Sequence, residues 1–167
     1  LILCAALMIV LGGCGTQDGD GTETAAPQEV KLAYVNWAEG VAVTHLMQSI
    51  LEDMGYSVTT TMADVAPIFA SIAGGDQDIM IETWVPVTHK SYWEKFDGQF
   101  EELGTWFDKA KIGLVTPAYT EINSIPELPQ IKDQLDGKIV GIDAGAGIMV
   151  TTEKAIEEYD LDFELVT

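Results

Sequence analysis

The sequence predicts an α/β protein with two lobes, each built on a parallel sheet. Three observations support this prediction. Short apolar runs alternate with stretches in which apolar residues recur at helical spacing, glycines close the helical stretches, and the alternation begins again after a break near residue 117. Strands that alternate with helices run parallel, and the helices cover the faces of the sheet.

The first lobe is expected over residues 30–116. A helix is predicted at 41–54, where apolar residues recur at helical spacing before Gly55, and another at 65–73, which Gly74 and Gly75 close. The stretch 89–107 is aromatic and charged, and is expected to be helix followed by loop. The predicted strands of this lobe are 30–36, 56–62, 78–83 and 112–115.

A hinge and the start of a second lobe are expected over residues 117–167. Ser124 is placed to cap a short helix, with Glu127 at the capping-box position. The remaining predicted elements are a strand at 138–143, a tight loop at 144–147, a helix at 148–159 and a strand at 163–166. Because this lobe holds little more than one β-α-β unit, and the chain ends within a strand, we expect the chain to be a fragment.

The amino-terminal residues are typical of an exported lipoprotein. Residues 1–13 carry no charge and are mostly apolar, which is too short for a membrane span of about 17–25 residues but fits the apolar region of a signal peptide. Leu11-Gly12-Gly13-Cys14 resembles a bacterial or archaeal lipobox, so Cys14 is expected to carry a lipid that anchors the protein to the cell membrane. Residues 14–29 contain no large apolar side chain and are expected to be a flexible tether.

Composition excludes several functions. The net charge is −19, from 27 acidic and 8 basic residues, and every basic residue is lysine, so a nucleic-acid partner is not expected. Cys4 would leave with the signal peptide and Cys14 would carry lipid, which leaves no cysteine for a disulfide or a metal. No phosphate loop, nucleophile elbow or zinc motif is present, so we expect neither an enzyme nor a metal or cofactor.

Two tryptophans and a histidine are the candidate ligand-binding side chains. Trp37 and Trp84 each close a short apolar run, which places them at the carboxyl edge of a predicted sheet, where ligands bind. A tryptophan face attracts cations, and His89 could donate to a carboxylate. Either tryptophan could equally be packing, and His89 could be a helix-capping or surface residue; the equivalent placement of the tryptophans favours a pocket for a small zwitterion.

The loop Gly145-Ala146-Gly147 precedes a predicted helix. The free N–H groups and the dipole of a helix N-terminus form an anion site, although a plain tight turn would have the same sequence. A dinucleotide fingerprint is excluded, because the spacing from Gly141 is G-x-x-x-G-x-G and not G-x-G-x-x-G.

Four blocks of the sequence resemble the glycine betaine/proline betaine substrate-binding lipoproteins of ABC transporters. They are Lys31 to Trp37, Ala63 to Pro67, Trp84 to Lys90 and Gly141 to Met149, and the similarity runs from about Val30 to Thr167. The resemblance implies a type II periplasmic-binding-protein-like clamp, in which two lobes close on an osmoprotective ligand and deliver it to an ABC permease.

The resemblance also implies roles for individual residues. Trp37 and Trp84 match two walls of an aromatic cage around the quaternary ammonium, His89 matches the side chain that binds the betaine carboxylate, and Gly147 and Ile148 match backbone amides on that carboxylate. Family members have a third tryptophan in a Gly-Trp-x-Pro-His-Trp-like segment, and this chain ends before it. Alternatives are the same fold with choline, carnitine or dimethylsulfoniopropionate, and, less favoured, a lipid-anchored α/β enzyme.

Overall fold

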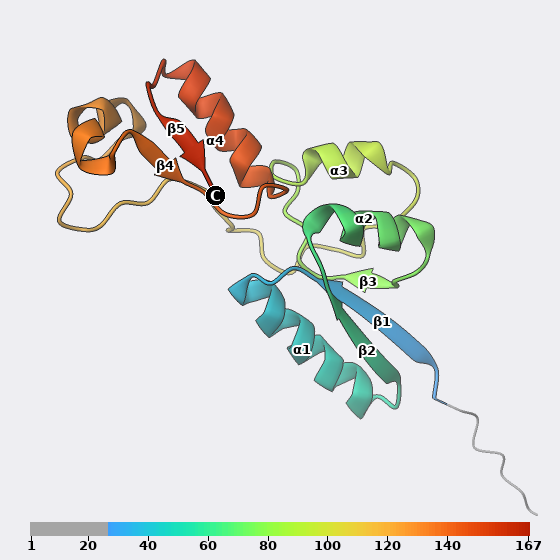
Figure 1. Ribbon diagram of the computed structural model, residues 1–167. Coiled ribbons are helices and arrows are strands. Elements are labelled where there is room, and N and C mark those ends of the chain that lie inside the picture. The colour runs from blue at the N-terminus through green and yellow to red at the C-terminus, as the bar shows by residue number, and fades with distance from the viewer. Residues whose placement is uncertain (1–26) are drawn as a thin grey trace, which may run out of the picture.

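The computed structural model describes residues 27–167, and these residues form two lobes (Figure 1). The predicted signal peptide, the predicted lipidation site at Cys14 and most of the predicted tether lie outside the described residues. Within residues 27–167, none of the helices combines the length and the apolar character needed to cross a membrane.

The first lobe is built on three parallel strands. They are β1 (Glu29–Tyr34), β2 (Ser57–Met62) and β3 (Ile79–Met80), in the order β2-β1-β3. β1 pairs with β2 along its whole length, from Glu29 opposite Ser57 to Tyr34 opposite Met62. Because β1 is the central strand, its residues Leu32 and Ala33 are almost completely buried.

Helices cover both sides of this sheet (Figure 1). They are α1 (Ala38–Asp53), α2 (Val65–Gly74) and the short α3 (Lys90–Lys95). The core lies between the sheet and α2, and its buried residues are Ala33, Val35, Val65, Ile68 and Phe69. The glycines after α2 act as predicted, since Gly75 takes the left-handed conformation, with a φ of 79°, that ends a helix.

The second lobe contains two parallel strands, β4 (Lys138–Val140) and β5 (Glu164–Val166), joined by α4 (Gly147–Glu158). A run of 3-10 turns, η1 (Ile125–Leu135), precedes β4 and carries the predicted capping box between Ser124 and Glu127. Leu128 and Ile131 of η1 pack with Ile139 and Leu161 to form a second, separate core.

One predicted strand is wrong, and three extend too far at their carboxyl ends. β1 ends at Tyr34, two residues before the predicted end. Residues 112–115 are irregular, and Val115 is 93% exposed, because no neighbouring strand in the described part of the chain pairs with this segment. β3 ends at Met80 although strand was predicted to residue 83. The carbonyl of Ile81 instead accepts a hydrogen bond from the indole Nε1 of Trp106, 2.8 Å away. β4 ends at Val140, three residues early.

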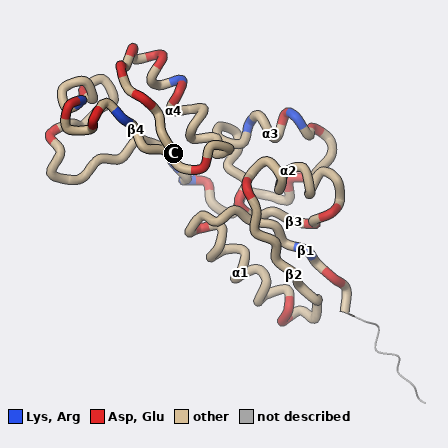
Figure 2. The backbone as a smooth tube through the Cα atoms, in the orientation of Figure 1, with Lys and Arg blue, Asp and Glu red and all other residues tan. Residues whose placement is uncertain are grey.

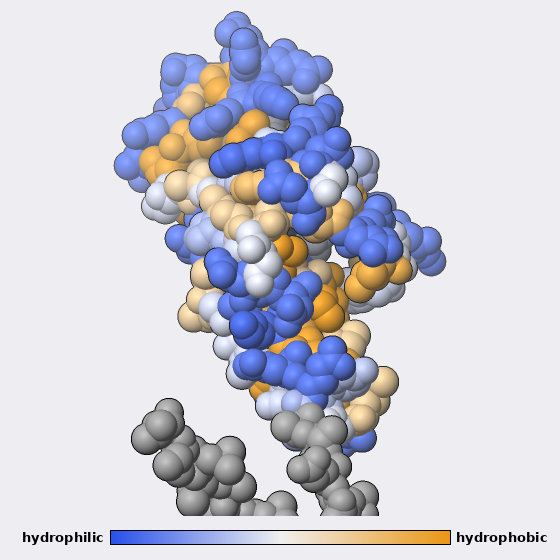
Figure 3. Space-filling view, turned by 90° about the vertical axis from the view of Figure 1, so that its right-hand side faces the viewer, coloured by the Kyte–Doolittle hydropathy of each residue, from blue (hydrophilic) through white to orange (hydrophobic). Residues whose placement is uncertain are grey.

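The face of the molecule drawn in Figure 3 is mostly hydrophilic, with apolar patches on both lobes. The exposed apolar side chains Leu46 and Ile50 of α1, and Met54, which directly follows α1 as its C-cap, lie at helical spacing. The two sheets point their carboxyl ends toward each other, so the loops that follow the strands meet between the lobes (Figure 1).

Candidate functional site

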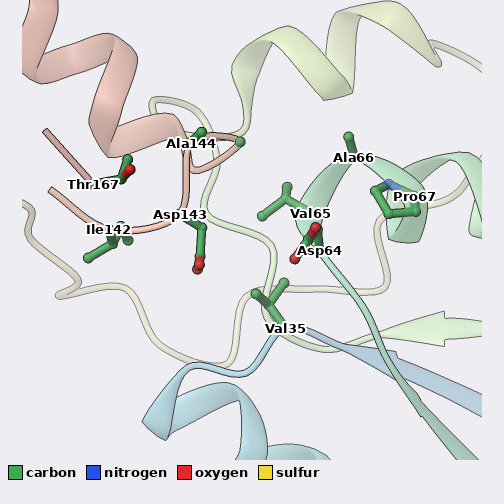
Figure 4. Close-up of a pocket in the computed structure, with 10 residues that line it drawn as sticks. Val35, Asp64, Val65, Ala66, Pro67, Ile142, Asp143, Ala144 and Thr167 are labelled. Atoms are coloured by element: carbon green, nitrogen blue, oxygen red, sulfur yellow. The ribbon is translucent and has the colours of Figure 1, made fainter.

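A cleft of about 530 Å³ lies between the lobes, at the carboxyl ends of both sheets. Val35 follows β1 and Asp64 follows β2, while Ile142 and Asp143 follow β4. The close-up shows Asp64 of the first lobe and Asp143 of the second lobe at this cleft (Figure 4). A smaller hollow of about 250 Å³ shares Val35, Asp64 and Asp143 and extends to Asn36. The carboxyl edges of parallel sheets are where α/β proteins bind ligands.

The predicted tryptophans and histidine do not line this cleft. Trp37 follows β1 as the N-cap of α1 and is half-buried. Its indole stacks on the ring of His89, with ring centroids 5.9 Å apart and planes 20° apart, and its Nε1 donates a hydrogen bond to Oδ2 of Asp143, 3.2 Å away. Trp37 therefore contacts both His89 and the opposite lobe.

His89 is completely buried at the N-cap of α3. Its Nδ1 accepts a hydrogen bond of 2.9 Å from the backbone N–H of Trp84, which requires the proton of the neutral ring to be on Nε2. Nε2 has no hydrogen-bond partner among residues 27–167. Burial lowers the pKa of His89 to about 4, because a charged imidazolium would lose its hydration.

Trp84 lies in the loop between β3 and α3. Its carbonyl accepts hydrogen bonds of 2.9 Å from the N–H of His89 and from the hydroxyl of Thr88. Its half-buried ring pairs with no other aromatic ring in residues 27–167. The backbone N–H of Trp84 thus bonds to the ring of His89, and the ring of Trp37 stacks on the same histidine. The two indoles do not form an aromatic pair with each other.

The turn at residues 143–147 connects β4 to α4 and touches the first lobe. The hydroxyl of Tyr92 donates to the carbonyl of Gly145 at 2.9 Å. Gly147 is buried against Thr88, and a Cβ at Gly147 would lie 1.7 Å from the Thr88 carbonyl oxygen. The N–H groups of Gly147 and Ile148, the first two residues of α4, find no acceptor within residues 27–167. These two amides remain available to an anion.

Sequence reasoning missed two carboxylates. Glu82 is only 3% exposed, both of its carboxylate oxygens lack partners in the described residues, and it packs directly against Gly40 of α1. Burial, and secondarily the negative charge of Glu39, raise the pKa of Glu82 to about 8. The second is Asp143, whose bond to Trp37 crosses between the lobes. The only sequence signal for Glu82 is its position at the end of an apolar run. No local feature of the sequence indicates Asp143.

No metal site is visible in the part of the chain that the structure describes. No group of three or more His, Cys, Asp or Glu side chains converges there. The chemistry available at the site is that of aromatic faces, one neutral histidine donor, free backbone amides and carboxylates.

A family model described as the substrate-binding domain of ABC-type glycine betaine transport systems matches residues 28–167. A curated relative is the glycine betaine/carnitine transport binding protein of Listeria monocytogenes, which is 39% identical over 114 residues. That match covers 68% of this chain and 38% of the relative.

Three solved structures share the fold, and each match covers 83% of this chain. A glycine betaine, L-proline-binding protein from Borrelia burgdorferi is 36% identical, with a TM-score of 0.79 and 53% of its chain covered. The lactococcal OpuAC in its closed form with glycine betaine is 36% identical, with a TM-score of 0.78 and 54% covered. An unliganded choline-binding protein is 27% identical, with a TM-score of 0.71 and 50% covered. The chain thus spans about half the length of these structures. Their similarity to this chain confirms the predicted two-lobed α/β fold.

Proposed function

The chain belongs to the family of substrate-binding domains of ABC-type glycine betaine transport systems, and on this premise we propose that it captures a quaternary-ammonium osmolyte outside the cytoplasm and delivers it to a membrane permease. The preferred ligand is glycine betaine or proline betaine. The family consists of transport receptors and not of enzymes.

The observation that carries the choice of ligand is the unpaired Nε2–H of His89. A buried donor without an acceptor costs roughly 1–3 kcal/mol, and a ligand carboxylate would remove this cost. Because burial keeps the ring neutral, His89 donates one hydrogen bond of defined direction. The free amides of Gly147 and Ile148 supply further donors from the opposite lobe. Both lobes would therefore hold the anionic end of a betaine.

The cationic end would bind to Trp37 and Trp84. Tryptophan faces attract quaternary ammonium groups by about 0.5–2 kcal/mol, depending on how well water is excluded. One face of Trp37 lies against the face of His89, so the opposite face of the indole is the one proposed for the cation. The Nε2–H of His89 points along the plane of its ring, so a carboxylate can accept a charge-assisted hydrogen bond from it while the two rings stay stacked.

Choline, carnitine and dimethylsulfoniopropionate are the competing ligands. Choline lacks a carboxylate, so it would leave the Nε2–H of His89 and the two amides unpaired. Carnitine and dimethylsulfoniopropionate carry a carboxylate and differ from the betaines in length or in the cationic group. The unpaired donors therefore favour the carboxylate ligands over choline.

Calorimetric titration with glycine betaine, proline betaine, carnitine and choline tests the proposal. We expect His89→Ala to weaken glycine betaine binding by at least tenfold, equal to about 1.4 kcal/mol, and to weaken choline binding much less. His45→Ala is the matched control, because His45 is exposed and its only side-chain hydrogen bond to residues 27–167 is with Gln48 within α1. Equal losses for glycine betaine and choline in His89→Ala would contradict the carboxylate role.

We also propose that a lipid on Cys14 anchors the protein. A Cys14→Ser precursor cannot be acylated, and acyl chains contribute about 0.8 kcal/mol of membrane binding per buried methylene. Membrane fractionation should find this variant unprocessed or released. Normal processing together with unchanged membrane retention would exclude the anchor.

A further inference from the structure

The contact between Asp143 and Trp37 joins two residues that the chain places in different lobes. Asp143 follows β4 of the second lobe and Trp37 follows β1 of the first, and Oδ2 of the carboxylate lies 3.2 Å from the indole Nε1. Asp143 lines the cleft between the lobes (Figure 4), and Trp37 lies within hydrogen-bond distance of it without lining the cleft. The bond can form only when the lobes are close together.

The same turn makes two more contacts with the first lobe. The hydroxyl of Tyr92 donates to Gly145, and Gly147 packs against the backbone of Thr88. These contacts hold the backbone of the turn, whereas Asp143 alone reaches the side chain of Trp37. Lobe closure therefore adds a second restraint to the Trp37 indole, whose face already stacks on His89 of the first lobe.

We propose that Asp143 is a positioning residue that holds the indole of Trp37 in place when the lobes close, and so couples closure to assembly of the cation-binding face. This proposal rests on the proposed function for its effect on affinity, whereas the contact between Asp143 and Trp37 can be tested without a ligand. A hydrogen bond from Nε1–H to a carboxylate also leaves the indole ring richer in electrons, which favours a cation on its face. Asp143 would thus act on the ligand through Trp37.

The first experiment needs no ligand. In the intact protein labelled with ¹⁵N at the indole nitrogens, the Trp37 signal is assigned with Trp37→Phe, and the exchange of its Nε1–H with water is measured by NMR. We expect exchange at least several-fold faster in Asp143→Ala than in the wild type, and an intermediate rate in Asp143→Asn, which keeps an acceptor oxygen. Trp106 is the internal control, because its Nε1–H is bonded to the carbonyl of Ile81 within the first lobe. Equal Trp37 exchange in Asp143→Ala and wild type would overturn the proposal.

The second experiment is a glycine betaine titration. Asp143→Ala should weaken binding by about three- to tenfold, with partial recovery in Asp143→Asn, as expected for one hydrogen bond to a charged group. Asp133→Ala is the matched control, because it removes an equal charge from an exposed position of the same lobe, outside the cleft. A loss in Asp133→Ala as large as in Asp143→Ala would show that net charge alone acts, and would overturn the positioning role. A wild-type protein that binds no betaine would contradict the proposed function, while the exchange experiment would still decide whether Asp143 holds Trp37.

Discussion

Two buried ionisable side chains, His89 and Glu82, are held in their neutral forms by the fold. Burial lowers the pKa of His89 to about 4 and raises the pKa of Glu82 to about 8. In the sequence, Glu82 lies two residues before Trp84 and His89 lies five residues after it. Near neutral pH, neither of these side chains therefore carries a fixed charge.

The buried carboxyl of Glu82 predicts a pH-dependent stability. Between its ordinary pKa of 4.5 and its folded pKa of about 8, the unfolded chain releases the proton and the folded chain keeps it. The contribution of Glu82 to folding stability therefore falls as pH rises through this window. Glu82→Gln cannot ionise, so we expect its melting temperature to exceed that of the wild type by a few degrees at pH 8.5 and by much less at pH 4.5.

Thermal unfolding at these two pH values checks this prediction. Glu153→Gln, at an exposed position of α4, is the control for loss of a surface carboxylate. A stability gain in Glu82→Gln that is the same at both pH values would mean that the carboxyl group of Glu82 is not kept protonated by burial.

Trp37 and Trp84 make different contacts in the structure, and this predicts different responses to substitution. Trp→Ala at either position should weaken betaine binding by about 1–2 kcal/mol, and Phe should restore part of the loss. Recovery with Phe should be poorer at position 37, because phenylalanine keeps the ring but cannot donate to Asp143. Titration calorimetry on the four variants measures both effects, and unchanged affinity in both alanine variants would reduce the tryptophans to packing residues.

At the scale of the elements, the start of α4 is fixed by a close backbone contact. A Cβ at Gly147 would meet the Thr88 carbonyl oxygen at 1.7 Å, whereas a Cβ at Gly145 would lie 3.6 Å from the Tyr92 hydroxyl, an ordinary contact. We therefore expect Gly147→Ala to weaken glycine betaine binding at least tenfold and to lower the melting temperature, since overpacking costs about 1–3 kcal/mol. Gly145→Ala is the matched control and should change both much less. Equal behaviour of the two variants would mean that the turn does not need to dock on Thr88.

The elements that the sequence predicts well are those with local signals. α2 ends at the predicted glycines, with Gly75 at a φ of 79°, and the capping box predicted from Ser124 and Glu127 is present. The segment 112–115 has the apolar composition of a strand, but a strand also needs a partner, and pairing between distant segments is not encoded in composition. The strand predicted at 112–115 is wrong because its apolar composition is not matched by a pairing strand in the described residues.

For the residues of the site, too, local features could be predicted and tertiary contacts could not. The positions of Trp37 and Trp84 after strands could be predicted, because strand ends and chain-breaking residues are local features. The stacking of Trp37 on His89 and its bond to Asp143 could not, because they join residues separated by tens of positions in the chain. Burial of Glu82 depends on the approach of Gly40 from α1, which is equally a tertiary contact.

At the scale of the whole molecule, negative charge dominates the surface. Figure 2 shows acidic residues along both lobes and few lysines between them. Among residues 27–167 only two ion pairs form, Lys90 with Glu94 and Lys132 with Asp162. With a net charge of −19, most carboxylates of the described residues therefore have no ion-pair partner, and the excess negative charges repel one another. Such self-repulsion keeps a protein soluble but destabilises its compact state.

This repulsion predicts that salt stabilises the fold. The Debye length falls from about 30 Å at 0.01 M to about 8 Å at 0.15 M, so the melting temperature should rise across that range of sodium chloride.

Replacing Glu157 and Glu158 by lysine changes the net charge from −19 to −15. It also places cations in the last turn of α4, which has no basic residue in the wild type. This variant should melt at a higher temperature than the wild type in low salt and should depend less on salt. The double variant Glu157→Gln/Glu158→Gln separates the loss of repulsion from the effect of cations on the helix dipole, because it removes two negative charges without adding cations at the helix end. A wild-type melting temperature that falls as salt is added would show that attractive ion pairs outweigh repulsion in this molecule.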